Sequence, residues 1–96
     1  MEDATQDAAG AAVEALRGFL ERQLEELEDP RNVHTVRERL YGRRWTEALD
    51  IESLPEDVEA TVTAEVERAW GALSRYPWDL YGAQQALKSA VERAVI

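Results

Sequence analysis

The chain has 96 residues, a formal net charge of -9 and no cysteine, and 45% of its residues are hydrophobic. This length allows one domain with one core and is too short for two. The composition is too apolar for a disordered acidic tail and too charged for a membrane protein, since no stretch approaches the roughly 20 apolar residues of a spanning helix. Disulfides and thiolate metal sites are excluded, so packing must supply the folding energy. The N-terminus has no basic start followed by an apolar run, which predicts a cytoplasmic protein.

The first predicted element is a long amphipathic helix from Ala8 to Asp29. Apolar residues recur at steps of three and four while glutamates occupy the other side, as in a helix with one buried face. Pro30 disfavours a helical conformation at the residue before it, so the helix should end near Asp29. Residues 1–7 are polar and acidic and are expected to fray. The predicted buried face consists of Val13, Leu16, Leu20, Leu24 and Leu27, with Phe19 beside them.

A second helix is predicted to follow at once. Asp29 can cap it and Pro30 suits its first position. We expect a break or kink near Gly42, where glycine can adopt the left-handed conformation that ends a helix. The alternative is a helix that continues to Leu49 and absorbs the glycine at a cost of about 1 kcal/mol. The predicted inward residues of this helix are Val33, Val36 and Leu40, with Tyr41 as a further candidate.

A third helix is predicted after a connection at residues 50–55, whose apolar side chains should tuck under the bundle. Ser53, followed three residues later by Glu56, has the spelling of a capping box. The helix should end at Arg75 or Tyr76, just before a proline. Its buried ridge is Val58, Val62, Val66, Trp70 and Leu73.

The fourth helix is predicted to run from Pro77 to the C-terminus. Small residues at four-residue steps along it, matched in the first helix, let two helix backbones come close. We therefore expect the start of the first helix to pack against the end of the last, within one chain or across a homodimer. The four segments predict an all-α fold, a compact bundle of three to four helices that forms a single domain over residues 1–96. The small residues are Gly82, Ala86, Ala90 and Ala94, and in the first helix Ala4, Ala8 and Ala12.

Basic residues are concentrated between Arg31 and Arg44. This window holds five of the 11 cationic side chains and one acid, whereas the rest of the chain is strongly acidic. The arginines either pair with glutamates of neighbouring helices, or bind nucleic acid with interleaved aromatic side chains, or meet an acidic partner or a second copy of the chain. Two rows of guanidinium groups would form if the helix continued past Gly42, but the net negative charge and the lack of a nucleic-acid-binding motif argue against nucleic acid. The candidate residues are Arg37, Arg39, Arg43 and Arg44, with Tyr41 and Trp45.

Negative charge gathers near the end of the first helix, where the helix dipole disfavours it. A neighbouring cation such as Arg31 would compensate for it; alternatively, the acids form a face that binds a basic partner. A calcium loop is not predicted, because the run lacks alternating carboxylates and a glycine-containing turn. The candidate residues are Glu21, Glu25 and Glu28.

Aromatic residues cluster around the expected turn between the third and fourth helices. Trp70 is expected to fill the core. Trp78, which follows Pro77, is either a core residue or an exposed binding hot spot together with Tyr81. The single histidine, His34, has neither a second histidine nor the carboxylate motifs of helical metal centres beside it, so we predict no metal, cofactor or catalytic site.

These features predict a small acidic interaction module rather than an enzyme, because signatures of nucleophile, base and phosphate loop are all absent. Its partner is expected to be a protein with a basic surface, which it would inhibit, neutralise or scaffold, as antitoxins, immunity proteins and phage-encoded inhibitors of similar size and charge do. One alternative is a nucleic-acid-binding or regulatory module that uses the window from Arg31 to Arg44. A second alternative is a helical bundle that binds a small ligand or catalyses a reaction near Trp45 and Trp70. A homodimer is compatible with all three.

Overall fold

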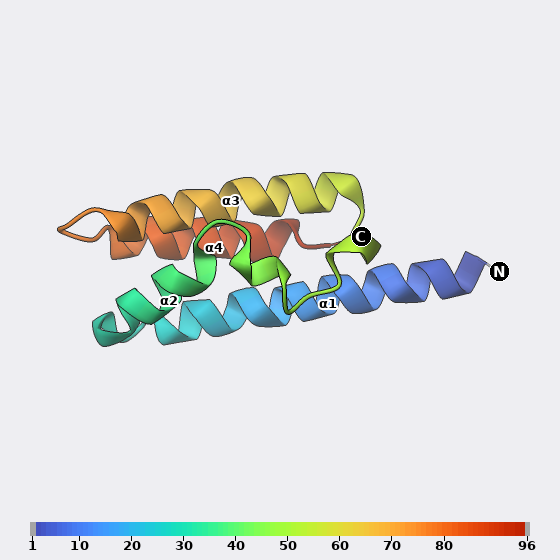
Figure 1. Cartoon of the computed structure of the whole chain (residues 1–96), viewed down its shortest axis with the longest axis horizontal. Helices are drawn as coiled ribbons and strands as arrows, with labels where there is room; N and C mark the ends of the chain where they lie inside the picture. Colours follow the sequence, from blue (N-terminus) through green and yellow to red (C-terminus); the bar gives the residue numbers. More distant parts are fainter. Residues whose placement is uncertain (1, 96) are drawn as a thin grey trace.

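A computed structural model describes the backbone of residues 2–95 and the side chains of residues 8–95. Over this range the chain is all-α: the helices pack side by side as a bundle, and the connections contain short 3-10 turns (Figure 1). This confirms the predicted fold class. Residues 2–7, which were predicted to fray, form the first turns of α1, so this helix begins at Glu2 and not at Ala8. Met1 and the side chains of residues 2–7 lie outside the described part. The elements are α1 (Glu2–Glu26), η1 (Pro30–Asn32), α2 (Val33–Leu40), η2 (Arg44–Thr46), η3 (Ile51–Ser53), α3 (Glu56–Ser74) and α4 (Leu80–Arg93).

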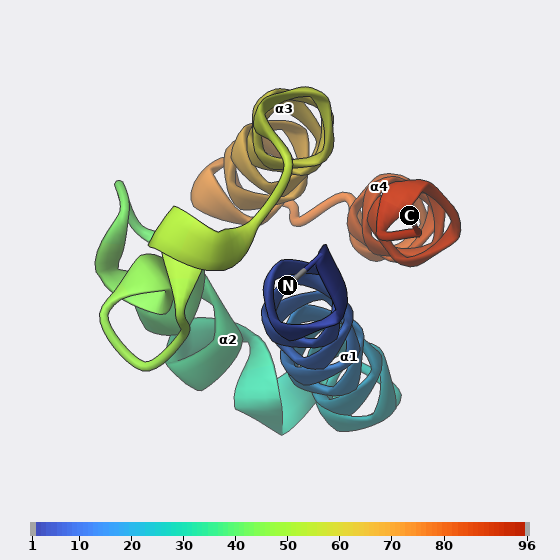
Figure 2. The same ribbon diagram turned by 90° about the vertical axis from the view of Figure 1, so that its right-hand side faces the viewer.

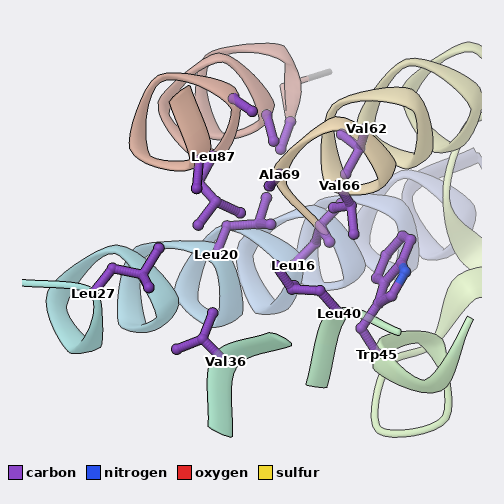
Figure 3. Packing of buried hydrophobic residues seen from close by; sticks show 14 of the residues in the cluster. Leu16, Leu20, Leu27, Val36, Leu40, Trp45, Val62, Val66, Ala69 and Leu87 are labelled. Atoms are coloured by element: carbon purple, nitrogen blue, oxygen red, sulfur yellow. The ribbon is translucent and has the colours of Figure 1, made fainter. Parts of the chain in front are cut away.

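The four helices surround one hydrophobic core. Viewed along the bundle, α4 lies beside both α3 and α1, and α2 packs against α3 (Figure 2). Leu16 and Leu20 of α1 are fully buried and lie among side chains of the other helices (Figure 3). The predicted ridge of α3 is buried except for Trp70, which is half-buried. Other core residues are Leu27, Val36, Leu40, Trp45, Leu54, Ala69 and Leu87.

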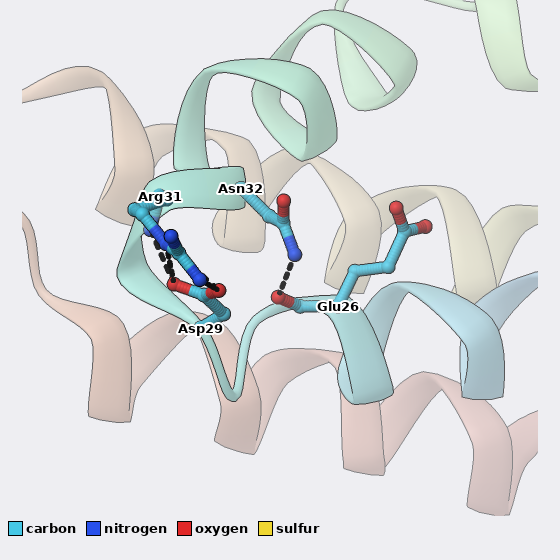
Figure 4. Close-up of polar contacts among 4 residues, drawn as sticks. All are labelled: Glu26, Asp29, Arg31 and Asn32. Atoms are coloured by element: carbon cyan, nitrogen blue, oxygen red, sulfur yellow. Dashed lines mark hydrogen bonds and ion pairs between the residues drawn. The ribbon is translucent and has the colours of Figure 1, made fainter.

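The connection between α1 and α2 follows the local rules that its sequence predicts. The Asp29 carboxylate accepts a hydrogen bond from the backbone N–H of Arg31 at 3.0 Å, and Pro30 takes the first position of η1. Asn32 Nδ2 donates to the backbone oxygen of Glu26 at 2.9 Å, which satisfies a carbonyl at the open end of α1 (Figure 4). Asp29 therefore caps the start of the second helical segment, as expected.

Arg31 supplies part of the positive charge predicted beside the acidic end of α1. Its guanidinium Nη2 lies 2.8 Å from Asp29 Oδ2. The side-chain hydrogen bond from Arg31 lowers the pKa of Asp29, and the same contact raises the pKa of Arg31. Both groups are thus held in their charged forms.

Helix α2 ends at Leu40, so the predicted break near Gly42 is confirmed. Gly42 has a φ of 55°, in the left-handed region that glycine enters without a steric penalty. After this turn the chain folds back through η2 and places Trp45 in the core, with only 2% of its surface exposed. The continuous helix to Leu49 does not exist. Leu54 is buried and Ile51 packs against the core, as predicted for this connection.

The predicted starts of the third and fourth helices are also wrong. Ser53 does not cap α3: its hydroxyl donates to Asp50 Oδ2 at 2.6 Å, within the turn η3. Helix α3 begins after Pro55. The negative charges of the carboxylates in its first turn interact favourably with the positive end of the helix dipole. Helix α4 begins at Leu80 rather than at Pro77, because Asp79 provides the side-chain cap.

The small residues of α4 have two different roles. Ala86, Ala90 and Ala94 are fully buried, and Ala12 of α1 is nearly so, which agrees with the predicted close approach of α1 and α4 within one chain. Gly82 serves the cap instead: its N–H donates to Asp79 Oδ1 at 2.8 Å, and a Cβ there would collide with that carboxylate. The matching position on α1 is Ala12, since Ala8 is exposed.

Thr63 of α3 allows a test of how much an unsatisfied buried hydroxyl destabilises the fold. Its hydroxyl is buried and has no hydrogen-bond partner among the described residues. Replacing Thr63 with valine keeps the shape and removes an unsatisfied polar atom, so we expect the free energy of unfolding to rise by about 1 kcal/mol. Chemical denaturation measures this change. Thr61→Val is the matched control, because the Thr61 hydroxyl donates to the backbone oxygen of Asp57 at 2.6 Å. A gain at position 63 no larger than that at 61 would contradict the expectation.

Candidate interaction surfaces

The arginines between positions 31 and 44 are engaged with other side chains of the same chain. Arg39 pairs with Glu26 of α1, and its Nη1 also donates to Oε1 of the buried Gln23 at 3.2 Å. Arg43 Nη2 lies 2.6 Å from Glu59 Oε1 of α3. These two contacts tie α2 and the turn after it to the helices on either side. Arg44 pairs with Glu38 at 3.1 Å, Arg31 pairs with Asp29, and Arg37 Nη2 lies 3.1 Å from His34 Nδ1.

This arrangement favours the first of the three interpretations of the arginines. The two rows of guanidinium groups do not form, because α2 ends at Leu40. Trp45 is buried and cannot stack on a base, whereas Tyr41 is 56% exposed. Of the five arginines in this window, Arg37 alone lacks a carboxylate partner among the described side chains. Little uncompensated positive charge is left for a phosphate backbone.

An acidic groove lies between α1 and α4. Three glutamates of α1 at helical spacing line one wall, with half-buried Leu24 between them, and Gln84 and Lys88 of α4 line the other. The groove has a volume of about 640 Å3. None of its glutamates forms an ion pair with a described side chain, in contrast to Glu26, which faces Arg39. The predicted residues Glu21, Glu25 and Glu28 are therefore brought together in one groove with a net negative charge.

The α4 wall of this groove could not be assigned from the sequence. Lys88 is the only lysine of the chain, and Gln84 Nε2 reaches the backbone oxygen of Leu27 at 3.5 Å, which joins α4 to the end of α1. Gln84 and Lys88 stand one helical turn apart, which indicates that they share a face of α4. The sequence does not say which helix that face meets.

The aromatic residues near the turn between α3 and α4 differ in their burial. Trp78 is half-buried and packs against the core. Its ring meets His34 and Tyr76 edge to face, each with a centroid distance of 5.5 Å. Tyr76 and Tyr81 are 85% and 73% exposed. Of the two predicted partner-binding aromatics here, Tyr81 faces solvent and Trp78 belongs in part to the core.

Among the side chains of residues 8–95, no three histidine or carboxylate groups come together in a way that could hold a metal ion. Within the described range, no helix combines the length and apolar character needed to cross a bilayer. Comparison with protein-family models, with curated proteins and with solved structures gave no match to this chain.

Proposed function

We propose that this protein is a non-catalytic cytoplasmic interaction module that binds a basic segment of another protein in the acidic groove and so inhibits or scaffolds that protein. One observation carries the proposal. Glu21, Glu25 and Glu28 stand together without ion-pair partners among the described side chains, while the arginines of α2 and the following turn are mostly paired within the chain. Folding thus neutralises the basic window and leaves the negative charge of α1 available.

The groove offers a basic segment two kinds of contact. Its carboxylates attract lysine and arginine side chains and steer them during approach. Leu24, half-buried between the glutamates, provides apolar surface for the aliphatic stems of those side chains. Exposed ion pairs contribute about 0.2–1 kcal/mol each, so affinity should come from several pairs together and should fall as salt rises.

The nucleic-acid alternative draws less support from the same contacts. It needs free arginines at positions 37, 39, 43 and 44, and three of these have carboxylate partners. A polyanion would also have to approach a chain whose net charge is -9. Homodimerisation stays a prediction, which sedimentation of the purified protein would measure.

The proposal predicts that E21Q/E25Q/E28Q weakens capture of a basic partner. Wild-type and variant proteins would be used as bait in a lysate of the source organism, and the affinity of the captured protein would then be measured at several salt concentrations. We expect the triple variant to bind about 3- to 100-fold more weakly at low salt, from the loss of three exposed pairs. The difference should shrink at high salt.

A charge-matched control separates the groove from net charge. E47Q/E52Q/E56Q removes the same number of charges from exposed positions outside the groove and should bind nearly as well as wild type. Equal losses in the two triple variants would contradict the assignment to the groove. Binding that does not change with salt would overturn the electrostatic basis of the proposal.

A further inference from the structure

A second groove lies between the end of α2 and the C-terminal half of α3, whereas the acidic groove lies between α1 and α4. Its volume of about 520 Å3 falls within the range of about 300–1,000 Å3 that is typical of small-ligand sites. Its chemistry is aromatic and acidic. The lining residues are Leu40, Tyr41, Gly42, Glu67, Trp70 and Gly71.

Two aromatic rings form one part of this groove. The centroids of Tyr41 and Trp70 are 5.8 Å apart, and the ring planes are tilted by 55° rather than stacked. Tyr41 is 56% exposed and Trp70 is half-buried, so aromatic surface stays accessible. The face of an aromatic ring is electron-rich and attracts cations, and tryptophan does so most strongly.

A carboxylate without an ion-pair partner stands beside the rings. Glu67 is exposed, lies one helical turn before Trp70 and pairs with no described cation. Arg68, the next residue in the sequence, pairs with Glu65 at 2.8 Å, and Arg43, which follows Gly42 of the groove, pairs with Glu59 at 2.6 Å. The groove therefore combines aromatic faces with a free negative charge.

Two glycines keep the groove open, and only one of them is required by the backbone. Gly42 has the positive φ that ends α2. Gly71 lies inside α3, where glycine costs about 1 kcal/mol relative to alanine, yet a Cβ built there meets nothing within 4 Å. A side chain at position 71 would therefore meet no steric obstacle and would occupy part of the space that Gly71 lines.

We propose that this groove binds the guanidinium group of an arginine side chain presented by another protein. A guanidinium is planar, stacks on aromatic rings, and forms paired hydrogen bonds with a carboxylate, which suits Trp70, Tyr41 and Glu67. It is also less strongly hydrated than the ammonium group of lysine, so it enters a partly apolar groove at lower cost. This inference goes beyond the acidic groove and does not depend on it.

N-acetyl-arginine amide is the probe for the test, and the uncharged isostere N-acetyl-citrulline amide is its control. Titration into the 15N-labelled protein would be followed by amide and indole NMR shifts. We expect saturable shifts at the Trp70 indole N–H and at the amides of Gly42 and Gly71 with the arginine probe and not with citrulline. Equal shifts with both probes would overturn the proposal. So would arginine shifts confined to the acidic groove, a result that would leave the proposed function intact.

Three variants make the test specific to these residues. Glu67→Gln should weaken binding of the arginine probe about 5-fold or more, through loss of the charge-assisted pair. Gly71→Ala should weaken it as well, because the methyl group occupies the groove, while the melting temperature rises. Glu92→Gln makes the same charge change on exposed α4 and should leave binding unchanged. Unaltered binding in either Glu67→Gln or Gly71→Ala would contradict the assignment.

Discussion

Replacing Leu20 with alanine is expected to lower the free energy of unfolding by about 3–5 kcal/mol. Leu20 is fully buried and lies near Ala69 of α3 and Leu87 of α4 in the centre of the bundle (Figure 3). Its neighbours belong to different helices whose positions are fixed by many other contacts, so the cavity can collapse only in part. For a domain of this size, each kcal/mol shifts the melting temperature by about 4–8 °C, so the expected fall is at least about 12 °C.

Leu24→Ala provides the matched control on the same helix. Leu24 is half-buried and lines the acidic groove, so its truncation should cost less than half as much as that of Leu20. Thermal and denaturant unfolding, followed by circular dichroism, measure both variants. Equal losses would mean that the centre of the core lies elsewhere along α1.

The helix boundaries that the sequence predicts correctly rest on strict local chemistry. Pro30 disfavours a helical conformation at the residue before it, and Gly42 permits the left-handed conformation that ends a helix, whatever surrounds them. The structure ends α1 and α2 close to these two residues. The cap predicted at Ser53 was wrong because a serine hydroxyl can form hydrogen bonds with several nearby groups, and here it donates to Asp50. At the start of α4, the Asp79 side chain accepts a hydrogen bond from the N–H of Gly82. An aspartate in this position is a sequence signal for a cap, but the prediction placed the helix start at Pro77 instead.

The surface was harder to predict, because it depends on contacts between helices. The sequence shows the arginines and glutamates but not their pairing: Arg39 and Glu26 are 13 positions apart, and Arg43 and Glu59 are 16. The position of Trp45 also depends on the tertiary fold and not on the local sequence. It follows the arginines in sequence, but the turn at Gly42 sends it into the core. In contrast, Glu21, Glu25 and Glu28 share one helix face by spacing alone, so their grouping was predictable.

Trp78→Ala is expected to lower the free energy of unfolding by about 2–3 kcal/mol, roughly half to two thirds of the loss for a fully buried tryptophan. The ring is half-buried, packs against the core and contacts His34 at the start of α2. It therefore helps hold the turn between α3 and α4 against the beginning of α2. The melting temperature of the variant would measure this contribution.

Tyr81→Ala is the control for this prediction, since Tyr81 is 73% exposed and its truncation should change stability by no more than about 0.5 kcal/mol. A Trp78→Ala variant as stable as Tyr81→Ala would show that the indole contributes little to the fold. Trp78 would then join Tyr76 and Tyr81 as aromatic surface open to a partner. A large loss in Trp78→Ala alone would instead assign Trp78 to the core and leave Tyr76 and Tyr81 as the exposed aromatic residues near this turn.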